Sequence, residues 1–317
     1  MTPPPTLASR ATGRLRHFFL DPEGAEVAVE FSSVAVVGAR VESRRGRIEL
    51  RALSSVPLTP GAFLPTLEDP GFVVKEEIRD AVKSVLARVG AHPSARAALV
   101  VPDVLARFRL FAPDEVAAEP KQRDEIIAFR MQKLLPFAPS DVRVVSAWPR
   151  LPGEPVLAIG FSASVLGSYE QIGQAFGLDV GSVETSSMAL LRGVKTEGDA
   201  LLVRHDPAWL TLTLIRDGWP LSIRSFDAAV AREAAEVRRE IASTAVFWRD
   251  HLIGQRLAGA FVHASDPWVE ALKTEVAAAF GCVAERARPP VGMVVAGMPA
   301  SAERSATPAL TLLGAVD

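Results

Sequence analysis

The chain has 317 residues, 49% of them hydrophobic, and a formal net charge of −2. At about 100–200 residues per domain, this length predicts two or three domains, and the absence of a basic excess argues against a nucleic-acid partner. The single cysteine, Cys282, excludes an intrachain disulfide, and no apolar run approaches the ~18–20 residues of a transmembrane helix, so we expect a cytoplasmic protein.

Residues 1–22 form a basic N-terminal segment, with Arg10, Arg14 and Arg16 before the first acidic residue. This segment has no apolar stretch of the kind found in secretory signals. We expect a flexible tail. The alternative is a contact with an anionic membrane surface through its arginines and the aromatic pair Phe18 and Phe19.

A β-hairpin is predicted for residues 26–42, because apolar and polar residues alternate on both sides of Ser32 and Ser33. Residues 47–53 add a third strand. A helix is predicted next, over residues 73–90. Apolar residues at every third or fourth position form one buried stripe along it, and Gly90 ends it. Two short strands are expected within residues 95–111.

The middle of the chain predicts a helix over residues 121–135 that ends at Pro136. A hairpin over residues 141–161 comes next. The following helix starts near Ser164 and is terminated by Gly177. This order of strands and helices is typical of an α/β fold.

Residues 200–226 predict a second three-stranded meander, which begins about 170 residues after the first. One helix of six turns is expected over residues 227–252, and another over residues 266–281 with Asp266 as its N-cap. Two meanders, each followed by helices and further strands, indicate a duplicated α/β domain rather than a short-period repeat.

Two segments of this sequence have a distinctive order. In "DEIIAFRMQKLLPFAPSDVRVVSAWP" (124–149), a polar helix leads through Leu134, Leu135, Pro136 and Phe137 to Asp141, before a strand. In "LAIGFSASVLGSYEQIGQAFGLDVGSVETSSMALLR" (157–192), a strand and a helix precede a Gly-Leu pair, a strand and a Ser-x-Ala-Leu sequence. Both segments resemble the PilM family, the actin-like cytoplasmic proteins of type IV pilus assembly.

This resemblance implies a duplicated actin-like (ribonuclease H-like) α/β fold with two lobes. The first lobe would span residues 23–197, with a small subdomain inserted at about 98–183, and the second would span 198–317. In the family, a groove beside the subdomain holds the N-terminal peptide of PilN, a single-span inner-membrane protein. By analogy Leu134, Leu135, Pro136 and Phe137 lie near that groove, although a place in the subdomain core is an equal alternative.

The positions that match the family's phosphate loops depart from its pattern. The first loop, roughly Asp-Ile-Gly-Ser-Ser in the family, is Glu30, Phe31, Ser32, Ser33 and Val34 here. Phenylalanine replaces the glycine that lets a phosphate approach the backbone closely. We therefore expect the Phe31 side chain to obstruct a phosphate.

The second loop, Asp-x-Gly in the family, matches Asp206, Pro207 and Trp209. Proline removes an N–H donor and tryptophan fills space. The segment 261–268, which matches the adenosine contact, lacks both glycines of the family. These departures predict a degenerate nucleotide site.

Other chemistry has little support in the sequence. The five histidines are far apart and the chain has one cysteine, so no metal site is expected. Residues 160–164 lack the second glycine of a nucleophile elbow. Glu30 and Asp206 are two acids that could contact Mg²⁺, but two acids do not rebuild a nucleotide site. No catalytic residue and no cofactor is predicted.

The sequence therefore predicts a non-catalytic adaptor, a pseudo-ATPase peripheral to the cytoplasmic face of the inner membrane. The resemblance implies that it binds the N-terminal peptide of a PilN-like protein and associates with copies of itself. One alternative is an active actin-like ATPase that uses ATP and Mg²⁺ at Glu30 and Asp206. Another is an adaptor similar to GspL of type II secretion, with its membrane segment on a different chain.

Overall fold

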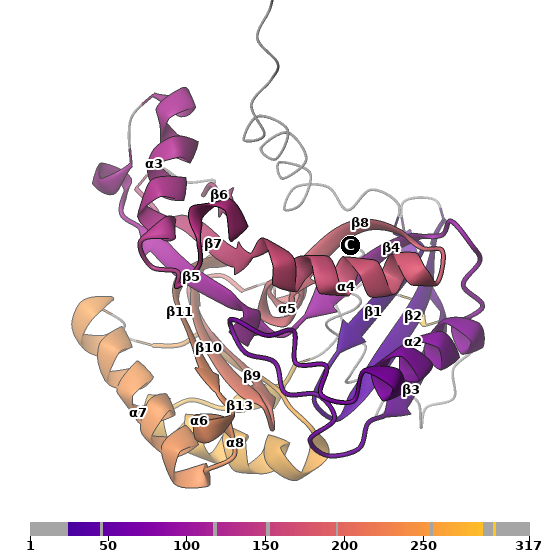
Figure 1. Cartoon of the computed structure of the whole chain (residues 1–317). Coiled ribbons are helices and arrows are strands. Elements are labelled where there is room, and N and C mark those ends of the chain that lie inside the picture. Colours follow the sequence, from indigo (N-terminus) through magenta and orange to yellow (C-terminus); the bar gives the residue numbers. More distant parts are fainter. Residues whose placement is uncertain are drawn as a thin grey trace, which may run out of the picture.

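The computed structural model describes residues 25–44, 47–116, 119–149, 153–194, 196–253, 256–287 and 294–295. Within these residues the strands form three sheets of six, five and three strands, with helices packed on them (Figure 1). None of the described helices combines the length and the apolar character needed to cross a bilayer. The expected N-terminal tail, with its proposed membrane contact, lies outside the described residues.

The six-stranded sheet forms the first lobe, in the strand order β14-β3-β2-β1-β4-β8. Its first three strands make the predicted antiparallel meander, whereas β4 and β8 run parallel to β1. The strands are β1 (Val27–Phe31), β2 (Ala35–Arg44), β3 (Arg47–Pro57), β4 (Arg96–Val101), β8 (Asp179–Thr185) and β14 (Val294–Val295).

Two helices, α2 (Lys75–Val89) and α4 (Ala163–Ala175), pack on one face of this sheet, and α5 (Ser186–Gly193) packs on the other. The apolar stripe predicted for α2 is buried, and the helix ends at Gly90, which adopts the left-handed conformation with φ of 69°. Gly38 of β2 allows α2 to lie close, because a Cβ there would lie 2.0 Å from Cγ1 of Val85.

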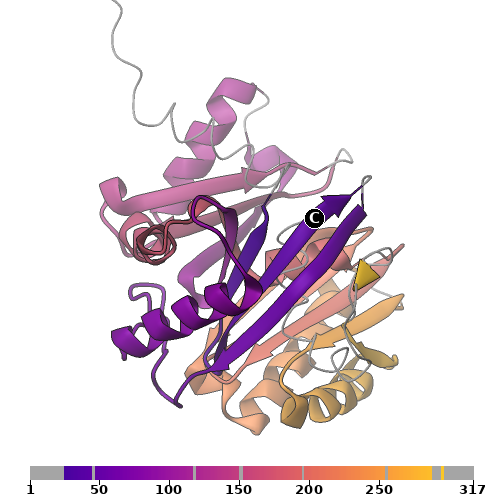
Figure 2. The same ribbon diagram turned by 90° about the vertical axis from the view of Figure 1, so that its right-hand side faces the viewer.

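A small subdomain is inserted between β4 and β8. Its antiparallel sheet has the order β5-β7-β6 and carries α3 on one face. Figure 2 shows this unit at one end of the molecule, and Figure 1 shows that it adjoins the second lobe as well as the first. The elements are β5 (Ala106–Phe111), α3 (Pro120–Gln132), β6 (Val142–Ala147) and β7 (Val156–Ser162). The interval 98–183 assigned to the subdomain from the sequence also includes parts of β4 and β8, which belong to the six-stranded sheet.

Helix α3 ends at Gln132, three residues earlier than the sequence predicted. Proline disfavours helical geometry at the residue before it, which here is Leu135. The chain accordingly leaves the helix through a tighter turn, in which the N–H of Leu134 donates to the carbonyl of Met131 at 3.0 Å. Leu134 and Leu135 therefore lie in a loop at the end of α3.

The second lobe contains the five-stranded sheet, in the order β11-β10-β9-β12-β13. This order repeats that of β3-β2-β1-β4-β8 in the first sheet, with an antiparallel meander followed by parallel strands. The expected duplicated α/β fold is confirmed. The elements are β9 (Asp199–Asp206), β10 (Trp209–Arg216), β11 (Trp219–Asp227), α6 (Ala228–Ala231), α7 (Ala234–His251), β12 (Gly259–His263), α8 (Asp266–Phe280) and β13 (Ala284–Arg286).

The prediction of one long helix over residues 227–252 was wrong, since the chain forms α6 and α7 with a break at Arg232 and Glu233. A tertiary contact accounts for the break. Nε2 of His205 donates to the carbonyl of Ala231 at 2.9 Å, so this carbonyl serves as acceptor for a side chain. The N–H of Arg232 donates to the carbonyl of Ala228 at 3.2 Å, and this bond completes the short helix α6.

The contact between Gly38 and α2 provides a test of the packing. We expect Gly38→Ala to lower the free energy of unfolding by about 1–3 kcal/mol, because the new methyl group would overlap Val85. Gly167→Ala is the control, since a Cβ at this helical position meets no atom within 4 Å. It should raise the free energy of unfolding by about 0.5–1 kcal/mol. Urea unfolding of both variants measures the two values, and equal effects would contradict the packing.

Candidate functional site

The residues predicted for the degenerate nucleotide site come together where the two lobes meet. The turn between β1 and β2 lies against the turn between β9 and β10. The Asp206 carboxylate accepts hydrogen bonds from the backbone N–H of Ser33 at 3.2 Å and from the Ser33 hydroxyl. It also accepts the N–H of Ala208 at 2.9 Å, which stabilises its own turn. Equivalent hairpin turns of the duplicated lobes are thus bonded directly to each other.

A buried ion pair lies beside this contact. Nη2 of Arg204 on β9 is 3.1 Å from Oε1 of Glu30 on β1, and both side chains are buried. Nη1 of Arg204 donates to the carbonyl of His205 at 2.7 Å. Removing one member of such a pair would leave an uncompensated charge in the interior. The pair is therefore a second fixed contact between the lobes.

The two aromatic residues of the predicted site have different surroundings. Phe31 points into the core of the first lobe, where its ring centroid lies 6.4, 6.3 and 5.1 Å from those of Phe63, Phe72 and Tyr169. Its side chain thus belongs to the hydrophobic core. Trp209, which is fully buried, reaches from the second lobe into the same core cluster. Its ring lies 5.5 Å from the Arg204 guanidinium carbon.

The two acids considered for Mg²⁺ are engaged with protein groups. Glu30 bonds to Arg204, and Asp206 accepts three hydrogen bonds. Burial raises the pKa of Asp206, although the charge of Arg204 and the hydrogen bonds lower it. Among the described residues there is no group of three or more histidine, cysteine, aspartate or glutamate side chains that could hold a metal ion.

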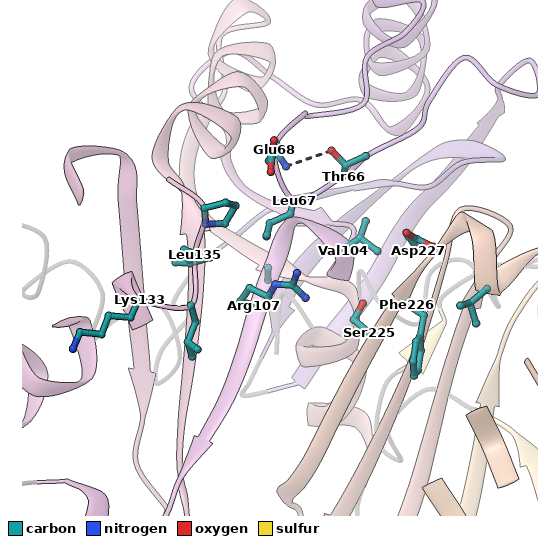
Figure 3. A pocket seen from close by; sticks show the side chains of 14 residues that line it. Thr66, Leu67, Glu68, Val104, Arg107, Lys133, Leu135, Ser225, Phe226 and Asp227 are labelled. Carbon is teal, nitrogen blue, oxygen red and sulfur yellow. Dashed lines mark hydrogen bonds between the residues drawn. The ribbon is translucent and has the colours of Figure 1, made fainter. Parts of the chain in front are cut away.

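A cleft of about 860 Å³ opens where the small subdomain meets both lobes. Figure 3 shows its walls. The lining residues are Thr66, Leu67, Glu68, Val104, Ala106, Arg107, Lys133, Leu134, Leu135, Pro136, Ser225, Phe226, Asp227 and Val230.

Three of the four residues predicted for the peptide groove line this cleft, and Phe137 does not. The Leu134 side chain is half exposed, at 50%, whereas Leu135 is buried. Leu135 also packs on β7, since a Cβ at Gly160 would lie 2.7 Å from its Cδ1. Leu134 is therefore exposed at the cleft, whereas Leu135 belongs both to the cleft lining and to the core of the subdomain.

Sheet edges border the cleft on two sides. β5 is the outermost strand of the small sheet and contributes Arg107, and β11 is the outermost strand of the second-lobe sheet and contributes Ser225 and Phe226 (Figure 3). Nε1 of Trp219 at the start of β11 donates to the carbonyl of Pro155 at 2.8 Å. This bond ties β11 to the small subdomain.

The cleft contains charges of both signs. Glu68 and Asp227 lie on the walls formed by the two lobes, and Arg107 and Lys133 on the wall formed by the small subdomain (Figure 3). Sequence reasoning missed the segments 66–68 and 225–230. No local pattern identifies them, because they meet only when the lobes pack together.

His205 connects this region to the core of the second lobe. It lies on β9, next to Asp206, with its ring 4.2 Å from that of Trp268. The pKa of His205 is lowered from 6.5 to about 4, chiefly by burial; the hydrogen bond to Ala231 opposes this shift and the charge of Arg204 adds to it. The imidazole is therefore neutral in the folded protein at pH 7.

This pKa predicts sensitivity to acid. Between pH 6.5 and 4 the unfolded chain binds a proton at residue 205 that the folded chain does not bind, so the free energy of unfolding falls by up to about 3 kcal/mol. His205→Gln retains a donor for Ala231 and should remove this loss. Urea unfolding between pH 7 and 4.5 tests it, and parallel curves for the two proteins would contradict the prediction.

The sequence matches no protein-family model and no curated protein sequence. Its structure is similar to a chain of the PilM-PilN type IV pilus biogenesis complex, with a TM-score of 0.75 at 16% identity, over 92% of this chain and 99% of that one.

Two further structures share the architecture. One is a Bacteroides thetaiotaomicron protein with an actin-like ATPase fold and unknown function, with a TM-score of 0.52, 10% identity and coverage of 84% of this chain and 92% of that one. The other is the cytoplasmic domain of EpsL, an inner-membrane component of the type II secretion system of Vibrio cholerae. Its TM-score is 0.51 at 9% identity, over 92% of this chain and 94% of that one. The chain therefore has an actin-like fold, and its structure resembles that of PilM.

Proposed function

We propose that this protein is a non-catalytic adaptor of a pilus or related assembly platform, and that its cleft binds the N-terminal peptide of a PilN-like membrane protein. The observation that carries the proposal is the position of Leu134, Leu135 and Pro136, which belong to the PilM-like segment and line the cleft. The likeness to the PilM-PilN complex supports the same choice of partner. The adaptor would work in the cytoplasm, peripheral to the inner membrane.

The shape of the cleft suits an extended peptide. An exposed strand edge has free backbone donors and acceptors, and a peptide can pair with them as an added strand. β5 and β11 supply such edges. Leu134 and Phe226 offer apolar contacts for alternate side chains of the peptide, and the volume of about 860 Å³ falls within the ~300–1,000 Å³ typical of ligand sites.

The contact between the lobes supports the non-catalytic part of the proposal. Mg²⁺ requires several oxygen ligands in near-octahedral geometry, and the Glu30 and Asp206 carboxylates are already bonded to Arg204 and Ser33. A nucleotide would have to displace these buried contacts. We therefore propose a pseudo-ATPase without a cofactor, and the active Mg²⁺-ATPase remains the alternative that the experiment below tests.

Self-association of the adaptor is proposed from the PilM resemblance alone. The likeness to the EpsL cytoplasmic domain supports a second candidate, an adaptor of a secretion system with the same architecture. The two candidates differ in the membrane protein that supplies the peptide. Parallel titrations with the peptides of both partner classes would separate them.

The pseudo-ATPase proposal predicts that Mg²⁺-ATP leaves the protein unchanged. A ligand present at 100 times its dissociation constant stabilises a folded protein by about 2.7 kcal/mol. We expect no shift of the melting temperature at millimolar Mg²⁺-ATP and no phosphate release above that of Glu30→Gln. Micromolar binding in a calorimetric titration, or phosphate release that Glu30→Gln abolishes, would restore the ATPase.

The peptide proposal predicts that a charge in the cleft weakens binding. We would titrate a fluorescent synthetic peptide of the PilN-like N terminus and follow its anisotropy. Leu134→Asp should weaken binding at least tenfold, or about 1.4 kcal/mol, because it places a charge against the peptide's apolar side chains. The matched control is Val246→Asp on α7, where a valine that is 48% exposed lies outside the cleft. Equal effects of the two substitutions, or no binding by the unmodified protein, would overturn the proposal.

A further inference from the structure

A row of polar side chains crosses the second-lobe sheet from the cleft to the first lobe. Ser225 of β11 lines the cleft, and its hydroxyl accepts a hydrogen bond from Oγ1 of Thr211 on β10 at 3.2 Å. Thr211 pairs in register with Arg204 of β9. Arg204 in turn binds Glu30 of the first lobe. One cleft residue is thus two steps from Arg204 of the buried ion pair between the lobes.

A second row runs beside the first. Asp227, which also lines the cleft, is in register with Trp209, and Trp209 is in register with Asp206. Asp206 accepts the hydrogen bonds from Ser33 of the first lobe. The two rows start at neighbouring cleft positions and end at the two contacts that join the lobes.

The position of the lobes determines the shape of the cleft, because each lobe supplies one wall. The first lobe supplies residues 66–68 and the second lobe supplies 225–230. At the far end of β11, Trp219 bonds to Pro155 of the small subdomain. The strand is therefore held at both ends, by the subdomain and through the sheet by the lobe contact.

From these observations we infer that two contacts, Ser33 with Asp206 and Glu30 with Arg204, position the walls of the cleft. They hold the β11 wall at a fixed distance from residues 66–68, so a peptide meets a preformed cleft rather than one it must assemble. Preorganisation of this kind increases affinity because less conformational freedom is lost on binding. The inference rests on the proposed function for the identity of the peptide, but the fixed position of the walls is a property of the free protein.

Two adjacent serines provide a matched test. Ser33→Ala removes the hydroxyl that donates to Asp206 across the lobes. Ser32→Ala changes the same turn, but the partner of the Ser32 hydroxyl among the described residues is the backbone of Ala35 within that turn. Both serines are buried. Any effect that is specific to Ser33→Ala therefore reports on the lobe contact.

Two threonines of β10 provide the same comparison nearer the cleft. Thr211→Val removes the hydrogen bond to Ser225. Thr213→Val removes a buried hydroxyl on the same face of the strand, for which no hydrogen-bond partner is found among the described residues. The two substitutions change the side-chain volume equally, so only the hydrogen bond distinguishes them.

The experiment measures peptide affinity by anisotropy and the distance between the lobes by electron paramagnetic resonance. Spin labels would be attached through Glu76→Cys on α2 and Ala229→Cys on α6, with Cys282→Ser to remove the native thiol. We expect Ser33→Ala to weaken peptide binding about fivefold and to broaden the distance distribution. Ser32→Ala should change neither. Thr211→Val should weaken binding by a similar factor, and Thr213→Val should not.

The outcomes separate this inference from the proposed function. If the unmodified protein binds no peptide and Ser33→Ala still broadens the distances, the proposed function fails and the positioning of the cleft walls stands. If the unmodified protein binds the peptide but Ser33→Ala and Ser32→Ala have equal affinities and equal distance distributions, the positioning inference fails and the proposed function stands.

Discussion

The arrangement of this molecule depends on the contact between two hairpin turns that occupy equivalent places in the two lobes. Ser33 donates to Asp206, and Glu30 pairs with Arg204. Buried charges and carboxylates are costly without partners, so neither lobe can move away without leaving polar groups unsatisfied. The contact thereby joins the lobes through the protein's own side chains. It also fixes the two lobe walls of the cleft, where the small subdomain adds the third.

Much of the fold could be predicted from local patterns. Alternating residues predicted both meanders, and the spacing of apolar residues predicted α2 with its end at Gly90. These features depend on periodicity within one element. The break between α6 and α7 could not be predicted in this way, because it depends on His205, which lies 26 residues before Ala231 in the sequence. A helical pattern carries no information about a side chain that bonds to its carbonyl from another strand.

The candidate site was predictable only in part. The segment around Leu134 was identified from a resemblance, and three of its residues do line the cleft. The core position of Phe31 could be predicted from the sequence, since Val27, Val29 and Phe31 alternate onto the core face of β1. The second-lobe wall at Ser225 to Val230 carries no local signal. It becomes a wall only through contacts between residues more than 170 positions apart, such as Ser33 and Asp206.

The central claim is that the cleft holds an extended peptide along the sheet edges that border it. Hydrogen–deuterium exchange of the full chain, with and without the synthetic PilN-type peptide, tests this claim most directly, because backbone amides of an edge strand exchange slowly only when they are paired. We predict that the peptide protects amides of β5 or β11 next to the cleft and leaves the turns at Ser33 and Pro207 unchanged. Protection confined to those turns, or to surfaces remote from the cleft, would contradict the account.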